Sequence, residues 1–156
     1  MEIKINLFIT LLLYAFVISQ SFFYILAMSN VLKNIQPATY IESRKLLDKN
    51  LRASLPVVYY LALIASIALT AFCLVNPSGL LFICSVIALA ALLADAVLTM
   101  KGNKPINKTI NTWSASDYPA NWKEYRSKWF IVYNMRQVAN IIGFVSLLAG
   151  LVFGFN

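Results

Sequence analysis

The stretch GLLFICSVIALAALLADAVLTM, residues 79–100, decides the fold class of this protein. It is long enough to cross a hydrocarbon core about 30 Å thick, which takes about 20 predominantly apolar residues in a helix. Only one of its side chains, Asp95, is ionisable. Because lipid offers no partner to backbone polar groups, such a segment must bond its own backbone internally, and it is predicted to be a transmembrane helix.

Three further runs have the same character, at residues 5–28, 55–75 and 129–153. The composition agrees, since 60% of the 156 residues are hydrophobic and only 12% are charged, whereas soluble domains carry about 25% charged residues. The first run continues through Leu26, too far for the hydrophobic region of a signal peptide, so it is predicted to be a span. The prediction is one all-α membrane domain, residues 1–156, folded as an antiparallel four-helix bundle.

The basic residues predict how the bundle lies in the membrane. Of the 13 lysines and arginines, 11 fall in the two connections at residues 29–54 and 101–128. The positive-inside rule then places both connections in the cytoplasm and both termini outside, together with the short turn at residues 76–78. We expect a multi-pass protein of the plasma membrane, which is the inner membrane if the source is bacterial. The net charge of +7 therefore indicates topology and contact with anionic membrane lipid, and no nucleic acid partner is predicted.

The two connections carry helix-start signals. Thr39 and Glu42 form a capping box, which predicts a short amphipathic cytoplasmic helix over residues 40–51. The apolar residues that would rest this helix on the membrane are Ile41, Leu47 and Leu51. A second signal of the same kind precedes Trp122, so the fourth helix should begin there and run unbroken into the bilayer.

Small residues recur at every fourth position in two of the spans. The series are Ala62, Ser66 and Thr70 in the second span, and Ser146, Gly150 and Gly154 in the fourth. Such stripes let helix backbones approach closely inside a membrane. The pattern leaves open whether each stripe faces a neighbour in the same chain or a second copy in a homo-oligomer.

A few polar side chains lie at a shared depth inside the spans. Asp95 and Arg136 lie roughly 8 and 11 Å inside the cytoplasmic ends of the third and fourth spans, at about 1.5 Å per residue, within reach of each other. Ionisable groups at such a depth usually pair inside the bundle or line a functional cavity. Gln20 and Tyr59 are at a similar level, so all four helices contribute to one polar layer.

The fourth helix carries a basic and aromatic face. Its members follow one another at spacings of three or four residues and are Trp122, Arg126, Trp129, Tyr133, Arg136 and Asn140. Such a face suits a flat or anionic guest held by stacking and by guanidinium groups. Two interpretations remain open: a pocket for a small apolar or aromatic molecule, or a non-enzymatic structural or partner-binding subunit in which the Asp95–Arg136 pair only fixes helix packing.

The composition limits the chemistry of any site. With no histidine, histidine-based catalysis and histidine-ligated metals are excluded, and two cysteines cannot form a four-thiolate centre. If the protein is an enzyme, Asp95 is the candidate for proton transfer, Tyr133 for donating to a developing oxyanion and Arg136 for stabilising its charge. No metal or cofactor is predicted. Cys73 and Cys84 could pair on the outer side or remain two buried thiols.

The third connection and the start of the fourth helix carry a distinctive set of residues, which are Asn103, Lys104, Pro105, Ile106, Asn107, Trp113, Pro119, Ala120, Asn121, Trp122, Arg126, Trp129, Asn134 and Arg136. In this part the chain resembles the anthrone-oxygenase-like family of small four-span membrane proteins. The resemblance implies a four-helix membrane fold and, as in a few members, cofactor-independent oxidation of anthrones to anthraquinones. It also implies one site made from Asn103, Asn107, Arg126, Asn134 and Arg136.

The topology is tested by thiol labelling with a membrane-impermeant maleimide. In a background without Cys73 and Cys84, Asn156→Cys should be labelled in intact cells or spheroplasts, and Ser116→Cys only after lysis, because the basic connections are retained inside. Labelling in the opposite order would contradict the predicted orientation.

Overall fold

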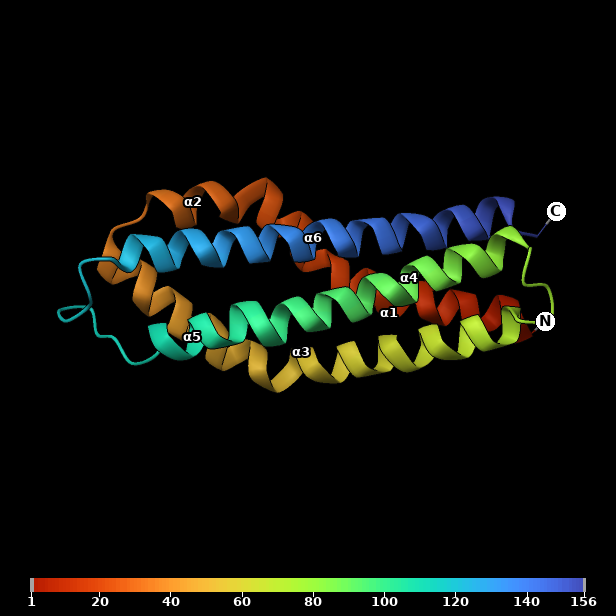
Figure 1. Ribbon diagram of the computed structural model, residues 1–156, viewed down its shortest axis with the longest axis horizontal. Coiled ribbons are helices and arrows are strands. Elements are labelled where there is room, and N and C mark those ends of the chain that lie inside the picture. Colours follow the sequence, from red (N-terminus) through yellow and green to blue (C-terminus); the bar gives the residue numbers. More distant parts are fainter. Residues whose placement is uncertain (1, 156) are drawn as a thin grey trace.

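The computed structural model describes residues 2–155, which form four long helical rods packed as an antiparallel bundle (Figure 1). The first rod comprises α1 (Glu2–Phe23), the π-helical turn η1 (Tyr24–Met28) and α2 (Ser29–Asn34), and the second is α3 (Pro37–Cys73). The third comprises α4 (Leu80–Leu98), the π-helical turn η2 (Thr99–Asn103) and α5 (Lys104–Ile110), and the fourth is α6 (Trp122–Phe153). All four rods are long and apolar enough to cross a membrane.

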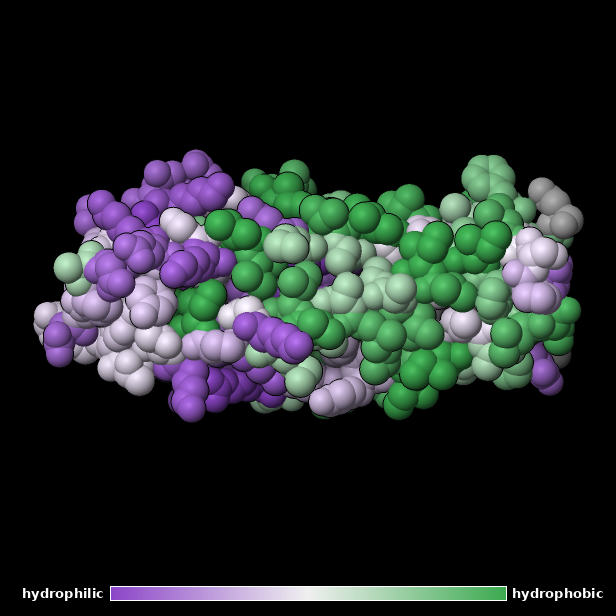
Figure 2. Space-filling view, in the orientation of Figure 1, coloured by the Kyte–Doolittle hydropathy of each residue, from purple (hydrophilic) through white to green (hydrophobic). Residues whose placement is uncertain are grey.

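The rods are longer than a bilayer requires. The longest has 37 residues, which makes it about 55 Å long at 1.5 Å per residue, against a hydrocarbon core of about 30 Å. The excess lies at the end of the bundle opposite the two chain termini (Figure 1). Hydrophilic residues gather at that end and hydrophobic residues cover the middle (Figure 2). We call this end, formed by residues 29–54 and 101–128, the basic cap.

Both stripes of small residues face inward, against other helices of the same chain. Ala62 and Ser66 are buried. At Gly150, an added Cβ atom would lie 3.0 Å from Leu81 and 3.1 Å from the Cβ atom of Cys84, so α4 and α6 approach closely there. Cys73 and Cys84 are two separate, buried thiols. The stripes therefore serve packing within the bundle.

The prediction of a separate helix over residues 40–51 is wrong, because α3 runs unbroken from the cap into the apolar part of the bundle. It begins at Pro37, whose fixed φ suits the first helical turn, and its N-cap is Gln36, so Thr39 and Glu42 of the predicted capping box lie inside the helix. Ile41 does not rest on a membrane, since it is fully buried in a cap core with Ile110 and Trp122. Leu47 and Leu51, the other two residues of the predicted apolar face, are 36% and 41% exposed, so of the three only Ile41 is buried against protein.

The third rod also differs from the prediction, because the expected connection from residue 101 is helical as far as Ile110. The turn η2 widens this rod where it leaves the apolar band, and it brings Asn103 into the bundle interior, 2% exposed. π-helical turns inside helices are frequent at functional sites. The fourth helix begins at Trp122, as predicted.

Replacement of Gly143 by Ala tests the close packing of the bundle. The new Cβ atom would overlap the Tyr14 hydroxyl, which donates to the Ala88 carbonyl, and would lie 3.0 Å from the Ala91 Cβ atom. We expect Gly143→Ala to lower the free energy of unfolding in detergent by about 1–3 kcal/mol, while Ile142→Ala, on the exposed side of the same turn, should cost less. A stabilised Gly143→Ala variant, as the helix propensity of alanine alone predicts, would contradict this packing.

Candidate functional site

The two ionisable residues of the spans meet inside the bundle. Arg136 Nε lies 2.6 Å from Asp95 Oδ1, and the two side chains are 9% and 1% exposed. Arg136 Nη1 also donates to Asn103 Oδ1 at 3.1 Å, and Asn103 Nδ2 donates to the Trp129 carbonyl at 3.1 Å. The guanidinium therefore joins α4, η2 and α6, as the depth of Asp95 and Arg136 in the sequence had suggested.

An aromatic column continues from this pair toward the cap. The guanidinium carbon of Arg136 lies 5.4 Å from the Tyr133 ring centroid, and Tyr133 stacks on Trp129 at 4.5 Å with an interplanar angle of 17°. The guanidinium carbon of Arg44 lies 4.0 Å from the Trp129 ring. The column thus has an arginine at each end and the rings of Tyr133 and Trp129 between them. These two rings occupy the position between the arginines in which a flat ligand would stack.

Asn107 is the hydrogen-bonding centre at the cap end of the column. Its Oδ1 accepts from Trp129 Nε1 at 2.9 Å and from Arg44 Nη2 at 3.1 Å, and its Nδ2 donates to Asp48 Oδ1 at 3.0 Å. Asp48 Oδ2 in turn accepts from Asn111 at 2.8 Å and from Arg52 at 2.7 Å. Sequence reasoning missed Arg44 and Asp48, because in the sequence they looked like ordinary charges of a connection.

The other predicted site residues are spread over several environments. Trp122 is buried beneath Arg126, whose guanidinium carbon lies 4.5 Å from its ring, and this pair packs in the cap. The Tyr59 hydroxyl donates to the Leu92 carbonyl. Gln20 is half-buried, and Asn134 is on the exposed side of α6. Of the five residues that the resemblance places at one site, Asn103 and Arg136 bond directly and Asn107 accepts from Trp129, while Arg126 and Asn134 lie elsewhere.

Several buried polar atoms near the ion pair have no hydrogen-bond partner among residues 2–155. They are Asp95 Oδ2, Gln137 Oε1, Ser21 Oγ, Tyr24 Oη, and both amide atoms of Asn140, which is fully buried. Tyr24 packs edge-on against Tyr133, so the antiparallel course of α1 and α6 places Ser21 at the level of Gln137. Gln137 and Asn140 follow Arg136 along α6, so part of this spare hydrogen-bonding capacity lies on the apolar side of the ion pair.

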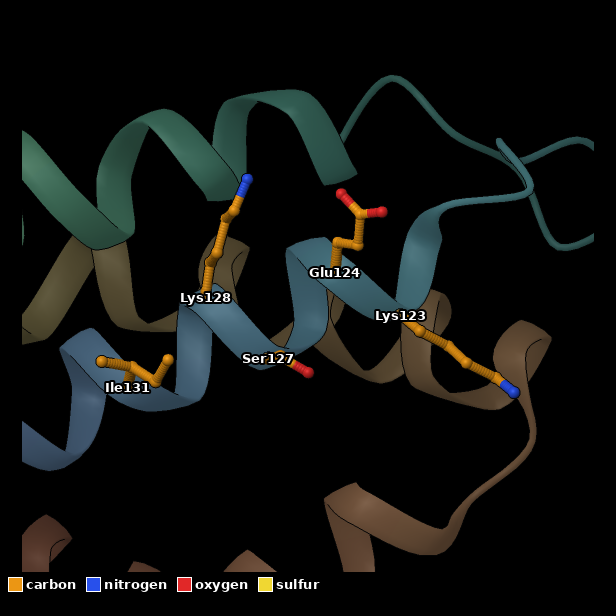
Figure 3. Close-up of a pocket in the computed structure, with 5 residues that line it drawn as sticks. All are labelled: Lys123, Glu124, Ser127, Lys128 and Ile131. Atoms are coloured by element: carbon orange, nitrogen blue, oxygen red, sulfur yellow. The ribbon is translucent and has the colours of Figure 1, made fainter.

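Two shallow hollows, each of about 450 Å³ and open to the surroundings, lie on the surface at or beside the basic cap, and neither is lined by Asp95, Tyr133 or Arg136. The first follows one helix, α6, where its lining residues are Lys123, Glu124, Ser127, Lys128 and Ile131 (Figure 3). The second lies between the α2–α3 connection and the start of α6. In the described part of the chain, no three Cys, Asp or Glu side chains come together as metal ligands.

Comparison with known proteins adds no identification. No family model, no curated protein and no solved structure matches this chain. Membership of the anthrone-oxygenase-like family therefore stays a prediction.

The pH dependence of stability tests the Asp48 cluster. Burial works to raise the pKa of Asp48, but hydrogen bonds from Asn111 and Arg52 outweigh it and lower the pKa below its ordinary value. Because the folded pKa lies below the unfolded value of about 3.9, the carboxylate stabilises the fold above that pH, and this contribution is lost as the pH falls through the folded pKa.

We therefore expect the free energy of unfolding to fall as the pH is lowered from about 5 to 3, and Asp48→Asn to flatten this dependence. All three tryptophans lie in or beside the cap, with Trp113 and Trp122 in its core and Trp129 bonded to Asn107, so tryptophan fluorescence during unfolding is a suitable measurement. Asp117→Asn, in the exposed loop, is the matched control. Equal flattening in both variants would contradict the assignment.

Proposed function

We propose that this chain is a non-enzymatic membrane protein whose polar layer fixes the packing of its four helices and whose basic cap contacts an anionic partner. The observation that carries the proposal is the Arg136 guanidinium, held by Asp95 from α4 and by Asn103 from η2 inside the bundle. The groups that a pocket would offer to a guest are used instead to join helices.

The energetics of buried charges support a role in packing. An unpaired charge in a bilayer is costly, so Arg136 and Asp95 are stable there only while they meet. If α4 slid past α6 by one turn, about 5.4 Å, the contact of 2.6 Å would be lost. One register of the helices is therefore favoured over its neighbours, which is the best-attested use of buried polar groups.

A second candidate function is favoured by the unpartnered atoms. Asp95 Oδ2 and the amide of Asn140 are buried without partners among residues 2–155, so a small molecule with a polar end would find hydrogen-bonding groups beside the ion pair. On this candidate Asp95, Tyr133 and Arg136 would take the roles of proton acceptor, donor and charge stabiliser, and the substrate class would be the small aromatic molecules that the resemblance implies.

Neutralising the ion pair separates the two candidates. We expect Asp95→Leu and Arg136→Met each to lower the free energy of unfolding by about 3–5 kcal/mol, because each leaves a buried charge unpaired. The double variant Asp95→Leu/Arg136→Met should be more stable than either single variant, since no charge remains, although Asn103 Oδ1 loses its donor. The measurement is unfolding in detergent, with Lys128→Met on the exposed side of α6 as control.

Native mass spectrometry of the same proteins provides the second readout. The packing role predicts the same set of bound small molecules in the wild type and the double variant. A small molecule that is released from the wild type and missing from a folded double variant would overturn the packing role in favour of the pocket. A loss of unfolding free energy in the double variant equal to the sum of the losses in the two single variants would also contradict the packing role, because it would show that the two side chains act independently.

A further inference from the structure

The hollow between the α2–α3 connection and the start of α6 is lined by positively charged side chains that form no ion pair within the described chain, residues 2–155. It is lined by eight residues, among them the three cations Lys33, Lys123 and Arg126, and none of the eight is acidic. Lys33 comes from α2 and the other two cations come from α6. These charges are therefore brought together by the fold, because Lys33 is far from Lys123 and Arg126 in the sequence.

The three cations are free to bind a ligand. In the part of the chain that the structure describes, none of them forms an ion pair with a carboxylate. The Lys33 ammonium lies 5.8 Å from the Phe130 ring, and the Arg126 guanidinium carbon lies 4.5 Å from the Trp122 ring. A stacked guanidinium keeps the N–H groups at its edge available for an oxyanion. Lys123 points from α6 away from Glu124 (Figure 3).

The hollow lies where the apolar surface of the bundle ends. Val31, two residues before Lys33, and Ile131, five residues after Arg126, are exposed apolar side chains, 49% and 61% exposed. Five helical residues span about 7–8 Å, and each headgroup layer is about 5–7 Å thick. Because lysine and arginine side chains extend along an apolar surface toward the headgroups, the cations of this hollow can reach the level of lipid phosphates.

We propose that this hollow binds the phosphate group of an anionic membrane lipid, with Arg126 as the guanidinium that forks onto its oxygens and Lys33 and Lys123 as point charges. The lipid source is favoured over free phosphate because α2 and α6 carry exposed apolar side chains, Val31 and Ile131, within about two helical turns of the cations, so acyl chains would find an apolar surface at that level. The inference rests on the proposed contact of the basic cap with an anionic partner and names that partner, while it is independent of the packing role of the bundle interior. The hollow along α6 is a weaker candidate, because Glu124 lines it.

Binding is measured by titrating the full-length protein in a neutral detergent with short-chain phosphatidylglycerol, short-chain phosphatidylcholine or inorganic phosphate, with tryptophan fluorescence as readout, since Trp122 lines the hollow. The test variant is Lys33→Gln/Lys123→Gln. The matched control is Lys104→Gln/Lys108→Gln, which removes two exposed charges from α5 in the same cap. An unchanged unfolding temperature confirms that each variant is folded.

We expect saturable binding of phosphatidylglycerol by the wild type and the control, weakened about tenfold or more in Lys33→Gln/Lys123→Gln. Arg126→Lys, which keeps the charge and loses the fork, should bind with intermediate strength. Equal weakening in the control, or equally tight binding of phosphatidylcholine, would overturn the site. Inorganic phosphate binding as tightly as phosphatidylglycerol would overturn the lipid as the source of the phosphate. Because none of these variants touches Asp95 or Arg136, failure here is distinguishable from failure of the packing role.

Discussion

The ion pair between Arg136 and Asp95 joins α4 and α6 inside the bundle. A charged side chain is tolerated at membrane depth only with a partner, and here the partner is 2.6 Å away on the neighbouring helix. The small residues of α6, such as Gly150 against α4, let the two helices approach closely. The turn η2 then brings Asn103 to the remaining side of the guanidinium. Close packing and charge pairing thus specify the same arrangement of α4 and α6.

The aromatic column connects this contact inside the bundle with the basic cap. It passes from Arg136 through Tyr133 and Trp129 to Arg44, and ends at Asn107, which bonds both Trp129 and Arg44. The cap is therefore an ordered continuation of the bundle and not a pair of loose connections. Since Asn107 comes from α5 and Arg44 from α3, the column also ties the second rod to the third. A displacement of α6 along the bundle would disturb packing in the cap.

Most of the fold could be predicted from the sequence, because span length, basic connections and the depth of Asp95 and Arg136 are all readable from hydrophobic patterning. The roles of Arg44 and Asp48 could not be predicted, because charges in a connection carry no sign of burial until the tertiary contacts of the cap are known. Asn134 is placed at the site by the resemblance, but a shared sequence motif does not tell whether a side chain faces the bundle interior. It follows Tyr133 directly, and one residue turns about 100° around a helix, so its exposure agrees with simple helical geometry.

The central claim is that Arg136 is bound directly by Asp95 and not through a guest. Solid-state NMR of the protein in lipid bilayers tests it, by measuring the dipolar coupling between 15N-labelled Arg136 Nε and the 13C-labelled carboxyl carbon of Asp95. We expect a strong coupling, because the nearest N and O atoms of the two groups are 2.6 Å apart, and we expect extraction of small molecules to leave this coupling unchanged. No measurable coupling, or a coupling that appears only after extraction, would contradict it.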